Sequence, residues 1–396
     1  MTLCDWYSDR EILLTGVTSE LGRALLEKLL RSFPRVKVYV ILRSKNGRDK
    51  SNRIKAIFAS PGYGRLLQDE PNAISRVKPF EGNLLYNGLG LAKADRTALT
   101  NVTVVLHAAG PHDAVFEFAQ ELPAVSVVGA ASSIFRHKGQ ITESLQNEYI
   151  PEIPLCLIRV PLLGPAWKEP MPGHVGILRG ATALMVGAGY ALCRSELPAE
   201  LIPIDLAVNT MLVAVYQRET REHKDSSTTV YNATTIGCTW GELINKAQRA
   251  NRNFAYPSFG IPGITSLVLL HRIVVFLLEW LPSVICDTIL SLFGGKNRIL
   301  EEHLRIRNAL QTLEPILLRS WPVERNRIHL LQRQLSLEEQ EAFPVCVNID
   351  VETYVLCAAA ATRKHCSDDR NSRIIKNFKW FSLAFIIFAI FLLLCK

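Results

Sequence analysis

The stretch Glu11-Ile-Leu-Leu-Thr15-Gly16, followed by Val17-Thr-Ser-Glu-Leu-Gly22, indicates the fold class of this chain. Its first part is typical of a short buried strand that ends in a tight turn, and leucines at helical spacing follow over residues 23–30. A strand, a glycine-bearing turn and a helix form the opening of a dinucleotide-binding fold, where the helix N-terminus and free backbone amides hold a pyrophosphate. The sequence therefore predicts a doubly wound, Rossmann-type α/β domain with a parallel sheet.

The turn carries the pattern T-G-x-x-G-x-x-G with one departure. Its members are Thr15, Gly16, Ser19 and Gly22, so a serine stands where the pattern has its middle glycine. That glycine allows close approach of backbone and phosphate, and Ser19 therefore predicts weaker binding than a glycine would give. On this motif alone, a plain turn between strand and helix is the alternative interpretation.

Further strands are expected at residues 36–42, 77–84 and 102–110. The first of these ends at Arg43, where NAD-specific folds place an acidic residue that binds the ribose hydroxyls. A basic residue at this point suits the 2′-phosphate of NADP, and a solvated loop arginine is the alternative. The small residues that begin at Ala108 would let the backbone pass beside the cofactor.

Composition and cysteine spacing narrow the class of protein. The chain has 396 residues, of which 48% are hydrophobic and 21% charged, which suits a globular protein of about two domains. The net charge of +8 is mild, and no nucleic-acid-binding motif accompanies it, so we expect no nucleic-acid partner. Nine cysteines without a C-x-x-C pair argue against a disulfide framework or a metal site and favour a reducing compartment.

The C-terminal segment is apolar. Trp380–Cys395 contains no charge and as a helix would span about 24 Å. We expect a transmembrane helix that anchors the protein, with a buried C-terminal helix as the alternative. Residues 261–293 are also apolar but contain charges and Pro282, so core helices and interfacial helices fit equally well there. The basic residues before the tail favour a cytosolic position for the bulk of the chain; they are Arg370, Arg373, Lys376 and Lys379.

Several motifs together resemble the alcohol-forming fatty acyl-CoA reductases, which are extended short-chain dehydrogenase/reductases. The motifs in the first half, in order, are Thr15-Gly16 with Gly22, Val40-Ile-Leu-Arg43, Glu81-Gly-Asn-Leu84, Leu89-Gly-Leu91 and Val104-Val-Leu-His107-Ala-Ala109. The most specific ones follow, and these are Ile158-Arg-Val-Pro161, Trp167-Lys-Glu-Pro170 with Pro172-Gly173, and Ile202-Pro-Ile-Asp205 up to Asn209.

The second half is similar to the C-terminal "sterile" domain of the same family. The similar segments are Val230-Tyr-Asn232, Thr239-Trp-Gly-Glu-Leu243, Trp321 with Asn326, residues 335–342 and the apolar tail. The resemblance predicts a Rossmann-type reductase domain at 1–235, a smaller, mostly helical domain at 236–368, and a basic flank with a membrane anchor at 369–396.

The resemblance also implies an activity. In this family, NADPH reduces a long-chain acyl-CoA through an aldehyde to a primary alcohol, and coenzyme A is released. The implied location is an intracellular membrane, either the endoplasmic reticulum or the peroxisome. The residues expected to bind the cofactor are Thr15, Gly16, Ser19, Gly22, Arg43, Asn83 and Ala108.

The catalytic pattern of the superfamily is broken in this chain. Its chemistry needs Y-x-x-x-K on one helix face, where the tyrosine gives a proton to the carbonyl oxygen, and no tyrosine here has a lysine four residues later. With a fifth strand at 124–131 and a helix at 133–143, Lys138 takes the place of the family lysine and Ile134 that of the tyrosine. The family serine falls on or near Gly129. Lys138 as a solvated surface residue is the alternative.

Compared with the family pattern, the chain is short on both sides of this strand, so two explanations stay open. The chain is either a catalytically inactive family member that binds cofactor or acyl-CoA at a membrane, or a reductase whose sequence is incomplete in its middle. A different extended reductase, such as a sugar-nucleotide epimerase or a steroid dehydrogenase, is a further alternative. The run that begins at Trp167 and the sterile-like domain argue against it.

Overall fold

The structure is a computed structural model of the whole chain. It describes residues 1–44, 49–110, 113–137, 139–145, 153–176, 181–185, 189–220, 228–253, 263–292 and 299–365. Lys138 and the expected anchor at Trp380–Cys395 lie outside the described residues.

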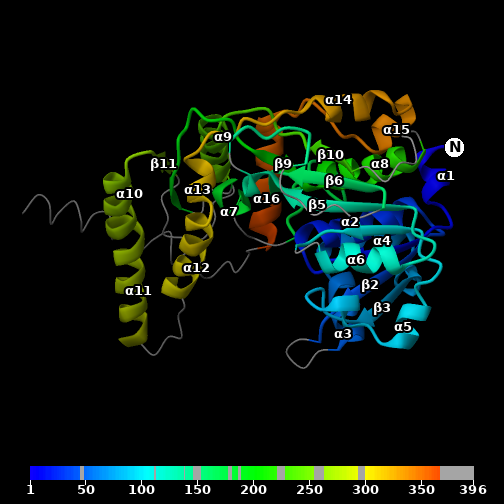
Figure 1. Cartoon of the computed structure of the whole chain (residues 1–396). Helices are drawn as coiled ribbons and strands as arrows, with labels where there is room; N and C mark the ends of the chain where they lie inside the picture. The colour runs from blue at the N-terminus through cyan, green and yellow to red at the C-terminus, as the bar shows by residue number, and fades with distance from the viewer. Residues whose placement is uncertain are drawn as a thin grey trace, which may run out of the picture. The chain divides into compact units, whose positions relative to one another are not determined.

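A seven-stranded sheet in the order β10-β6-β5-β4-β1-β2-β3 forms the centre of the first half (Figure 1). Its strands are β1 (Glu11–Thr15), β2 (Lys37–Leu42), β3 (Val77–Glu81), β4 (Val104–His107), β5 (Val127–Ser133), β6 (Leu155–Val160) and β10 (Thr228–Asn232). Every neighbouring pair is parallel, and this confirms the expected doubly wound α/β class.

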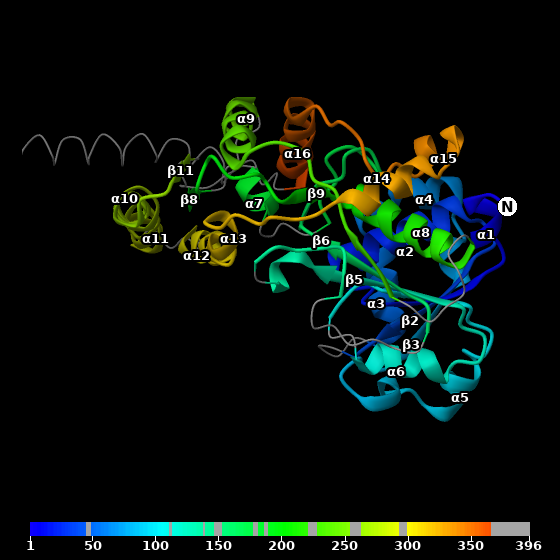
Figure 2. The same ribbon diagram turned by 45° about the horizontal axis from the view of Figure 1, so that its top comes forward.

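Helices cover both faces of this sheet, because its strands are apolar on both sides. Figure 2 shows α2 (Glu20–Ser32) and α8 (Ile204–Thr220) over one face and α6 (Asp113–Glu121) over the other. Residues of α8 are buried from Ile204 to Arg218, and α8 packs on β5 and β6. On the opposite face, Val115 and Phe116 of α6 join the core cluster that includes Leu13.

Smaller elements from several parts of the chain accompany this sheet. They are α1 (Leu3–Tyr7), α3 (Lys50–Phe58), η1 (Pro61–Tyr63), α4 (Gly64–Asp69), η2 (Ala73–Arg76), η3 (Asn87–Gly90), α5 (Lys93–Thr97), η4 (Ile134–Arg136), α14 (Asn326–Arg333), α15 (Leu337–Ala342) and the parallel pair β7 (Leu162–Gly164) and β9 (Leu201–Pro203).

The connection from β5 to β6 differs from the expectation. The fifth strand runs from Val127 to Ser133, later than the predicted 124–131, and the predicted helix at 133–143 is wrong. Only the single 3₁₀ turn η4 follows the strand, and the other described residues up to β6 form no helix.

The chain divides into two compact units. The first contains residues 1–171, 200–235 and 321–348, and the second contains 172–199, 236–320 and 349–396. The elements of the second unit are α7 (Ala181–Met185), β8 (Tyr190–Leu192), α9 (Trp240–Asn253), β11 (Gly263–Thr265), α10 (Val268–Val275), the π-helix η5 (Phe276–Trp280), α11 (Leu281–Leu292), α12 (Ile299–Gln311), α13 (Glu314–Leu317) and α16 (Val351–His365).

The second unit is mostly helical, with one short parallel pair, β8 and β11. Its helices α10, η5 and α11 follow one another without a break, so the charges and Pro282 do not interrupt them. Within this run, Val268–Ile289 is long and apolar enough to cross a membrane, and it is the one such helix in the part of the chain that the structure describes.

Candidate cofactor and active site

Two glycines shape the turn between β1 and α2. Gly16 has a φ of 77°, and a Cβ atom there would lie 2.7 Å from the Cβ of Ala109. A Cβ on Gly22 would lie 2.2 Å from the carbonyl oxygen of Gly16. Both positions therefore need glycine, the first for a left-handed turn beside β4 and the second for close packing of helix on strand.

Ser19 has a structural role that explains the departure from the glycine pattern. It is the N-cap of α2, and its hydroxyl oxygen accepts a hydrogen bond from the backbone N–H of Gly22 at 2.9 Å. The same hydroxyl donates to the carbonyl oxygen of Ala108 at 2.9 Å. Ser19 thus caps the helix and ties it to the residue after β4, which a glycine could not do.

A cavity of about 320 Å³ opens beside this turn. It lies at the carboxyl ends of β1, β2, β3 and β4, the edge at which doubly wound sheets bind their ligands. The described residues that line it are Gly16, Thr18, Ser19, Ile41, Leu42, Arg43, Arg53, Gly82, Asn83, Leu84, Leu85, Ala109 and Gly110.

The predicted cofactor residues have different positions with respect to this cavity. Four of them line it, and they are Gly16, Ser19, Arg43 and Asn83. The other three surround the turn. Thr15 is buried at the end of β1, Gly22 packs α2 on the turn, and Ala108 accepts the hydrogen bond of Ser19.

Two arginines bring positive charge to the cavity. Arg43 follows β2 and is exposed, and Arg53 comes from α3 and donates a hydrogen bond to the backbone carbonyl of Arg43. Burial lowers the pKa of Arg53, and the charges of Arg43 and Arg23 lower it further. Cations that repel one another in this way form a suitable site for a phosphate.

Sequence reasoning missed Arg53 because it sits ten residues after Arg43 on a helix. Its only signal is a basic residue within the first turn of the helix that follows the second strand. The structure places it beside the strand end, where it contacts the carbonyl of Arg43. Asp49 caps the same helix by accepting the backbone N–H of Asn52 at 2.8 Å.

Thr15 and His107 form a buried polar pair at the ends of β1 and β4. The hydroxyl of Thr15 lies 2.6 Å from Nδ1 of His107, and both residues are fully buried at the ends of β1 and β4. The contact joins two neighbouring strands at the residue that precedes Gly16, and it fixes the side chain of the motif threonine.

The loop after β5 is fixed to residues 321–324. Ile141 donates its backbone N–H to the carbonyl of Pro322 and accepts from the N–H of Glu324, both at 2.9 Å. Phe135 packs edge-on against Trp321 with ring centroids 5.0 Å apart. This loop therefore pairs in an extended form where the superfamily pattern has its catalytic helix.

Neither Ile134 nor Gly129, the positions expected for the family tyrosine and on or near the family serine, lines the cavity. Ile134 is fully buried. Gly129 lies inside β5, where a Cβ atom would come 2.4 Å from Cγ2 of Val215 in α8, so it faces the helix layer. The carboxyl end of β5 instead carries Ser132 and Ser133. Among the described residues that line the cavity, none is a tyrosine, a lysine or a histidine.

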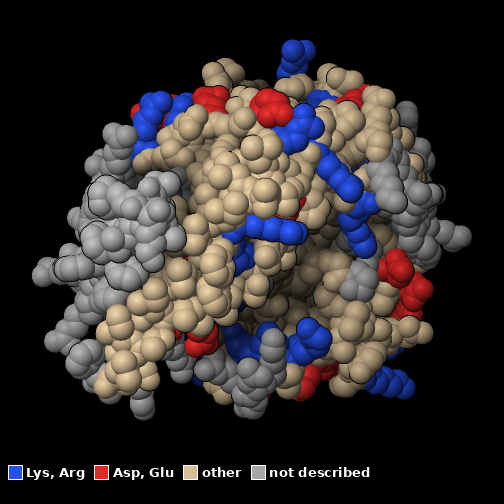
Figure 3. All heavy atoms as spheres, turned by 90° about the vertical axis from the view of Figure 1, so that its left-hand side faces the viewer, with Lys and Arg blue, Asp and Glu red and all other residues tan. Residues whose placement is uncertain are grey.

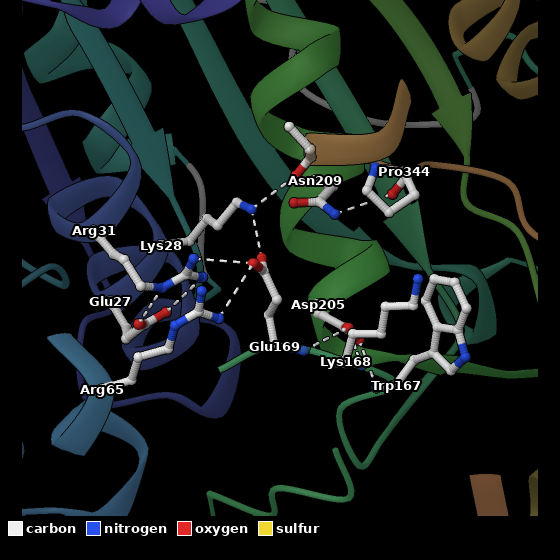
Figure 4. Close-up of polar contacts among 11 residues, drawn as sticks. Glu27, Lys28, Arg31, Arg65, Trp167, Lys168, Glu169, Asp205, Asn209 and Pro344 are labelled. Carbon is white, nitrogen blue, oxygen red and sulfur yellow. Dashed lines mark hydrogen bonds and ion pairs between the residues drawn. The ribbon is translucent and has the colours of Figure 1, made fainter. Parts of the chain in front are cut away.

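The segment Trp167–Glu169 is held by Asp205, at the start of α8 (Figure 4). The carboxylate of Asp205 accepts hydrogen bonds from the backbone N–H groups of Trp167, Lys168 and Glu169 at 2.9, 2.8 and 3.1 Å. Burial raises the pKa of Asp205, although these hydrogen bonds oppose the shift.

Glu169 then contacts two cations of α2, as Figure 4 shows. Its carboxylate lies 2.5 Å from Nζ of Lys28 and 2.9 Å from Nη1 of Arg31. Burial alone would raise the pKa of Glu169, but Arg31 and Lys28 lower it to about 2. The motif therefore fixes α2, the helix that carries the glycine turn at its N-terminus.

Comparisons with known proteins agree with this geometry. Two family models, both described as "Male sterility protein", match residues 14–133 and 278–369; the first is an NAD-binding model and the second the Sterile model. Together they cover more than half of the chain. The chain belongs to the fatty acyl-CoA reductase family. A curated relative, "Fatty acyl-CoA reductase 1" of Mus musculus, is 25% identical over 469 residues and covers 94% of this chain and 90% of its own length.

A second relative is matched over a somewhat smaller share of both chains. "Fatty acyl-CoA reductase 2" of Bos taurus is 25% identical over 87% of this chain and 81% of its own length. The alignment with the mouse protein is longer than the 396 residues of this chain, so the fatty acyl-CoA reductase of the mouse has internal segments that this chain lacks. The described residues between β5 and β6 form no helix beyond η4, which is consistent with such a loss.

Solved structures support the fold. A reductase domain of a non-ribosomal peptide synthetase from Mycobacterium tuberculosis has a TM-score of 0.58 and 14% identity, and covers 90% of this chain and 92% of its own. The family and the fold identify an oxidoreductase with a domain for a nicotinamide cofactor. In the described part of the chain, no group of three or more His, Cys, Asp or Glu residues could hold a metal ion.

Proposed function

We propose that this member of the family binds NADPH, with the 2′-phosphate between Arg43 and Arg53. The observation that carries this proposal is the cavity beside the glycine turn, which Arg43 and Arg53 both line and which has no acidic residue among its described lining residues. When bound, NADPH supplies a hydride. Gly16 and the N-terminus of α2 would hold the pyrophosphate, and Asn83 lines the same cavity.

We also propose that the substrate is a long-chain acyl-CoA. The support is the printed name of the curated relatives, together with a similarity that extends along nearly the whole chain. The expected reaction reduces the thioester to an aldehyde with release of coenzyme A, and then reduces the aldehyde to a primary alcohol. Each reduction needs a proton at the carbonyl oxygen as well as a hydride at the carbon.

Proton delivery is the step for which this chain is least equipped. The loop after β5 pairs with residues 322–324 and Ile134 is buried, and none of the described residues that line the cavity is a tyrosine, a lysine or a histidine. This favours a second candidate function, a catalytically inactive member that binds cofactor and acyl-CoA at a membrane. The two candidates share the cofactor site and differ in turnover alone.

A binding titration tests the cofactor proposal. Arg43→Ala and Arg53→Ala should each weaken NADPH binding about 5- to 150-fold, because a charge-assisted contact of about 1–3 kcal/mol is lost, and should affect NADH much less. Arg194→Ala is a matched control, since Arg194 is exposed and pairs with Glu196 instead. Equal losses for both cofactors would refute a 2′-phosphate site.

We further propose attachment to an intracellular membrane, the endoplasmic reticulum or the peroxisome, with the bulk of the chain in the cytosol. The support is the composition of Trp380–Cys395 and the basic residues that precede it. A membrane position suits a substrate whose acyl chain partitions into lipid.

A further inference from the structure

The helix formed by α10, η5 and α11 has its apolar side outside. Four large side chains at helical spacing are exposed along it, with exposed fractions between 37% and 73%. We call this set the apolar stripe, and its members are Leu269, Ile273, Phe276 and Trp280. Phe276 and Trp280 stack on each other with ring centroids 5.3 Å apart. Such a stripe is the opposite of what a helix on a soluble protein presents to water.

The other side of the same helix carries the polar groups and is buried. The carboxylate of Glu279 lies 2.8 Å from Nη1 of Arg307 in α12, and it accepts the backbone N–H of Tyr190 at 2.6 Å. The ring of His271 lies 3.2 Å from the carbonyl oxygen of Tyr190. Ser283 donates to the carbonyl of Glu279 at 2.6 Å. These polar residues of the apolar sequence thus make their hydrogen bonds inside the unit, on the side of the helix that faces away from the apolar stripe.

We propose that α10, η5 and α11 lie in the surface of a lipid bilayer, with the apolar stripe among the acyl chains. The helix packs along α12, β8 and β11 by its buried side, so it stays attached to the second unit and does not span the membrane by itself. A helix held in this way can insert its apolar side about 5–10 Å into the boundary between headgroups and acyl chains.

Several features favour a bilayer over a protein partner as the occupant. The stripe ends in an aromatic pair, and aromatic rings prefer the interface between membrane and water. Arg272 is exposed next to Ile273 and can reach lipid phosphates. Figure 3 shows the side on which α10 and α11 lie in Figure 1, and most of the described surface there carries neither acidic nor basic side chains.

The sequence that follows the second unit's last described helix also favours a membrane close to the stripe. The described part ends at His365, the last residue of α16, in the same compact unit as the stripe. Basic residues and the uncharged stretch Trp380–Cys395 follow in the sequence. The proposed contact does not depend on the reductase activity, and it differs from the tail because it uses a face of the folded unit.

The test uses the full chain with vesicles of phosphatidylcholine and phosphatidylserine whose acyl chains are brominated at mid-chain. Bromine quenches tryptophan only at close range, so quenching reports contact with the acyl chains. Trp280→Phe keeps the stripe apolar and should remove about half of the quenched emission if Trp380 in the tail supplies the rest. Trp321→Phe is the control, because Trp321 belongs to the other unit and should leave the quenched emission unchanged.

A second pair of variants tests the stripe without changing a tryptophan. Leu269→Glu should reduce the quenching of Trp280, whereas Leu337→Glu, another exposed leucine in the first turn of a helix, should not. If Trp280→Phe leaves the quenched emission unchanged, the stripe does not touch lipid and the proposal is wrong. A change of oligomeric state by Leu269→Glu in the absence of lipid, without an effect on quenching, would mean that a second copy covers the stripe.

Discussion

The hydroxyl of Ser19 donates a hydrogen bond to the carbonyl oxygen of Ala108 at 2.9 Å, and this contact joins the start of α2 to the end of β4. It lies at the turn where the pyrophosphate of a dinucleotide would bind. The same hydroxyl caps α2, so a single side chain fixes the turn from both sides. The serine that departs from the glycine pattern is therefore part of how this chain holds its turn.

Ser19→Ala should lower the free energy of unfolding by about 1–2 kcal/mol, because it removes an N-cap and a hydrogen bond to a strand end. Chemical denaturation measures this change. Ser75→Ala is the control, since the hydroxyl of Ser75 is exposed and bonds within its own turn to Asn72. A loss no larger than that of the control would show that the two contacts do not stabilise the turn.

Glu169→Gln should lower the free energy of unfolding by about 2–3 kcal/mol near neutral pH, because Lys28 and Arg31 lose a partly buried partner. The pKa of Glu169 falls from 4.5 to about 2 on folding. Its ionised form therefore stabilises the protein above pH 4.5, and this contribution is lost as the pH falls toward 2.

Denaturation of both proteins across the pH range tests the sign. The difference between native chain and variant should be constant at neutral pH and shrink as the solution becomes acidic. Glu196→Gln is the control, because Glu196 is exposed in its pair with Arg194 and should matter little. A difference that does not depend on pH would contradict the role of the charge on Glu169.

Ile134→Tyr should not restore turnover, although it places a tyrosine four residues before Lys138. Ile134 is fully buried, so the larger tyrosine side chain would overpack its site. This should lower the free energy of unfolding by about 1–3 kcal/mol. The measurements are NADPH consumption with a long-chain acyl-CoA and denaturation of the same sample. A gain of turnover in this variant would mean that the loop after β5 can present residue 134 to the substrate.

Removal of residues 370–396 should convert the protein from carbonate-resistant to carbonate-extractable in a membrane fractionation. The reason is that Trp380–Cys395 would insert fully, whereas the apolar stripe would contact lipid only at the surface. If the shortened chain still resists carbonate, the helix at Val268–Ile289 holds it in the membrane by itself.

The sheet could be predicted because its signal is local. The strands around Leu13 and Val40 are short apolar runs beside recognisable turns, and the structure contains both as neighbours. The glycine turn and Arg43 could be found in the same way, since they follow directly from strand ends. These features need no information about distant parts of the chain.

The rest depends on contacts between residues far apart in sequence. The family pattern predicts a helix at 133–143, but Ile141 pairs with residues 322–324, and the described residues there form no helix beyond η4. In the same way, Glu279 by itself indicates a break in an apolar helix. In the structure Arg307, which is 28 residues away, forms an ion pair with it inside the unit. Arg53 becomes a site residue only when α3 is placed against the end of β2.

The most direct test of the central claim is the rate at which the purified chain oxidises bound NADPH with a long-chain acyl-CoA in a single turnover. The proposed cofactor site is complete, but its described lining residues include no tyrosine, lysine or histidine that could deliver a proton. We expect NADPH to bind and its absorbance to decay about 10²–10⁴-fold more slowly than with the mouse relative under the same conditions. Decay at a rate similar to that of the relative would contradict the account and show that another group delivers the proton.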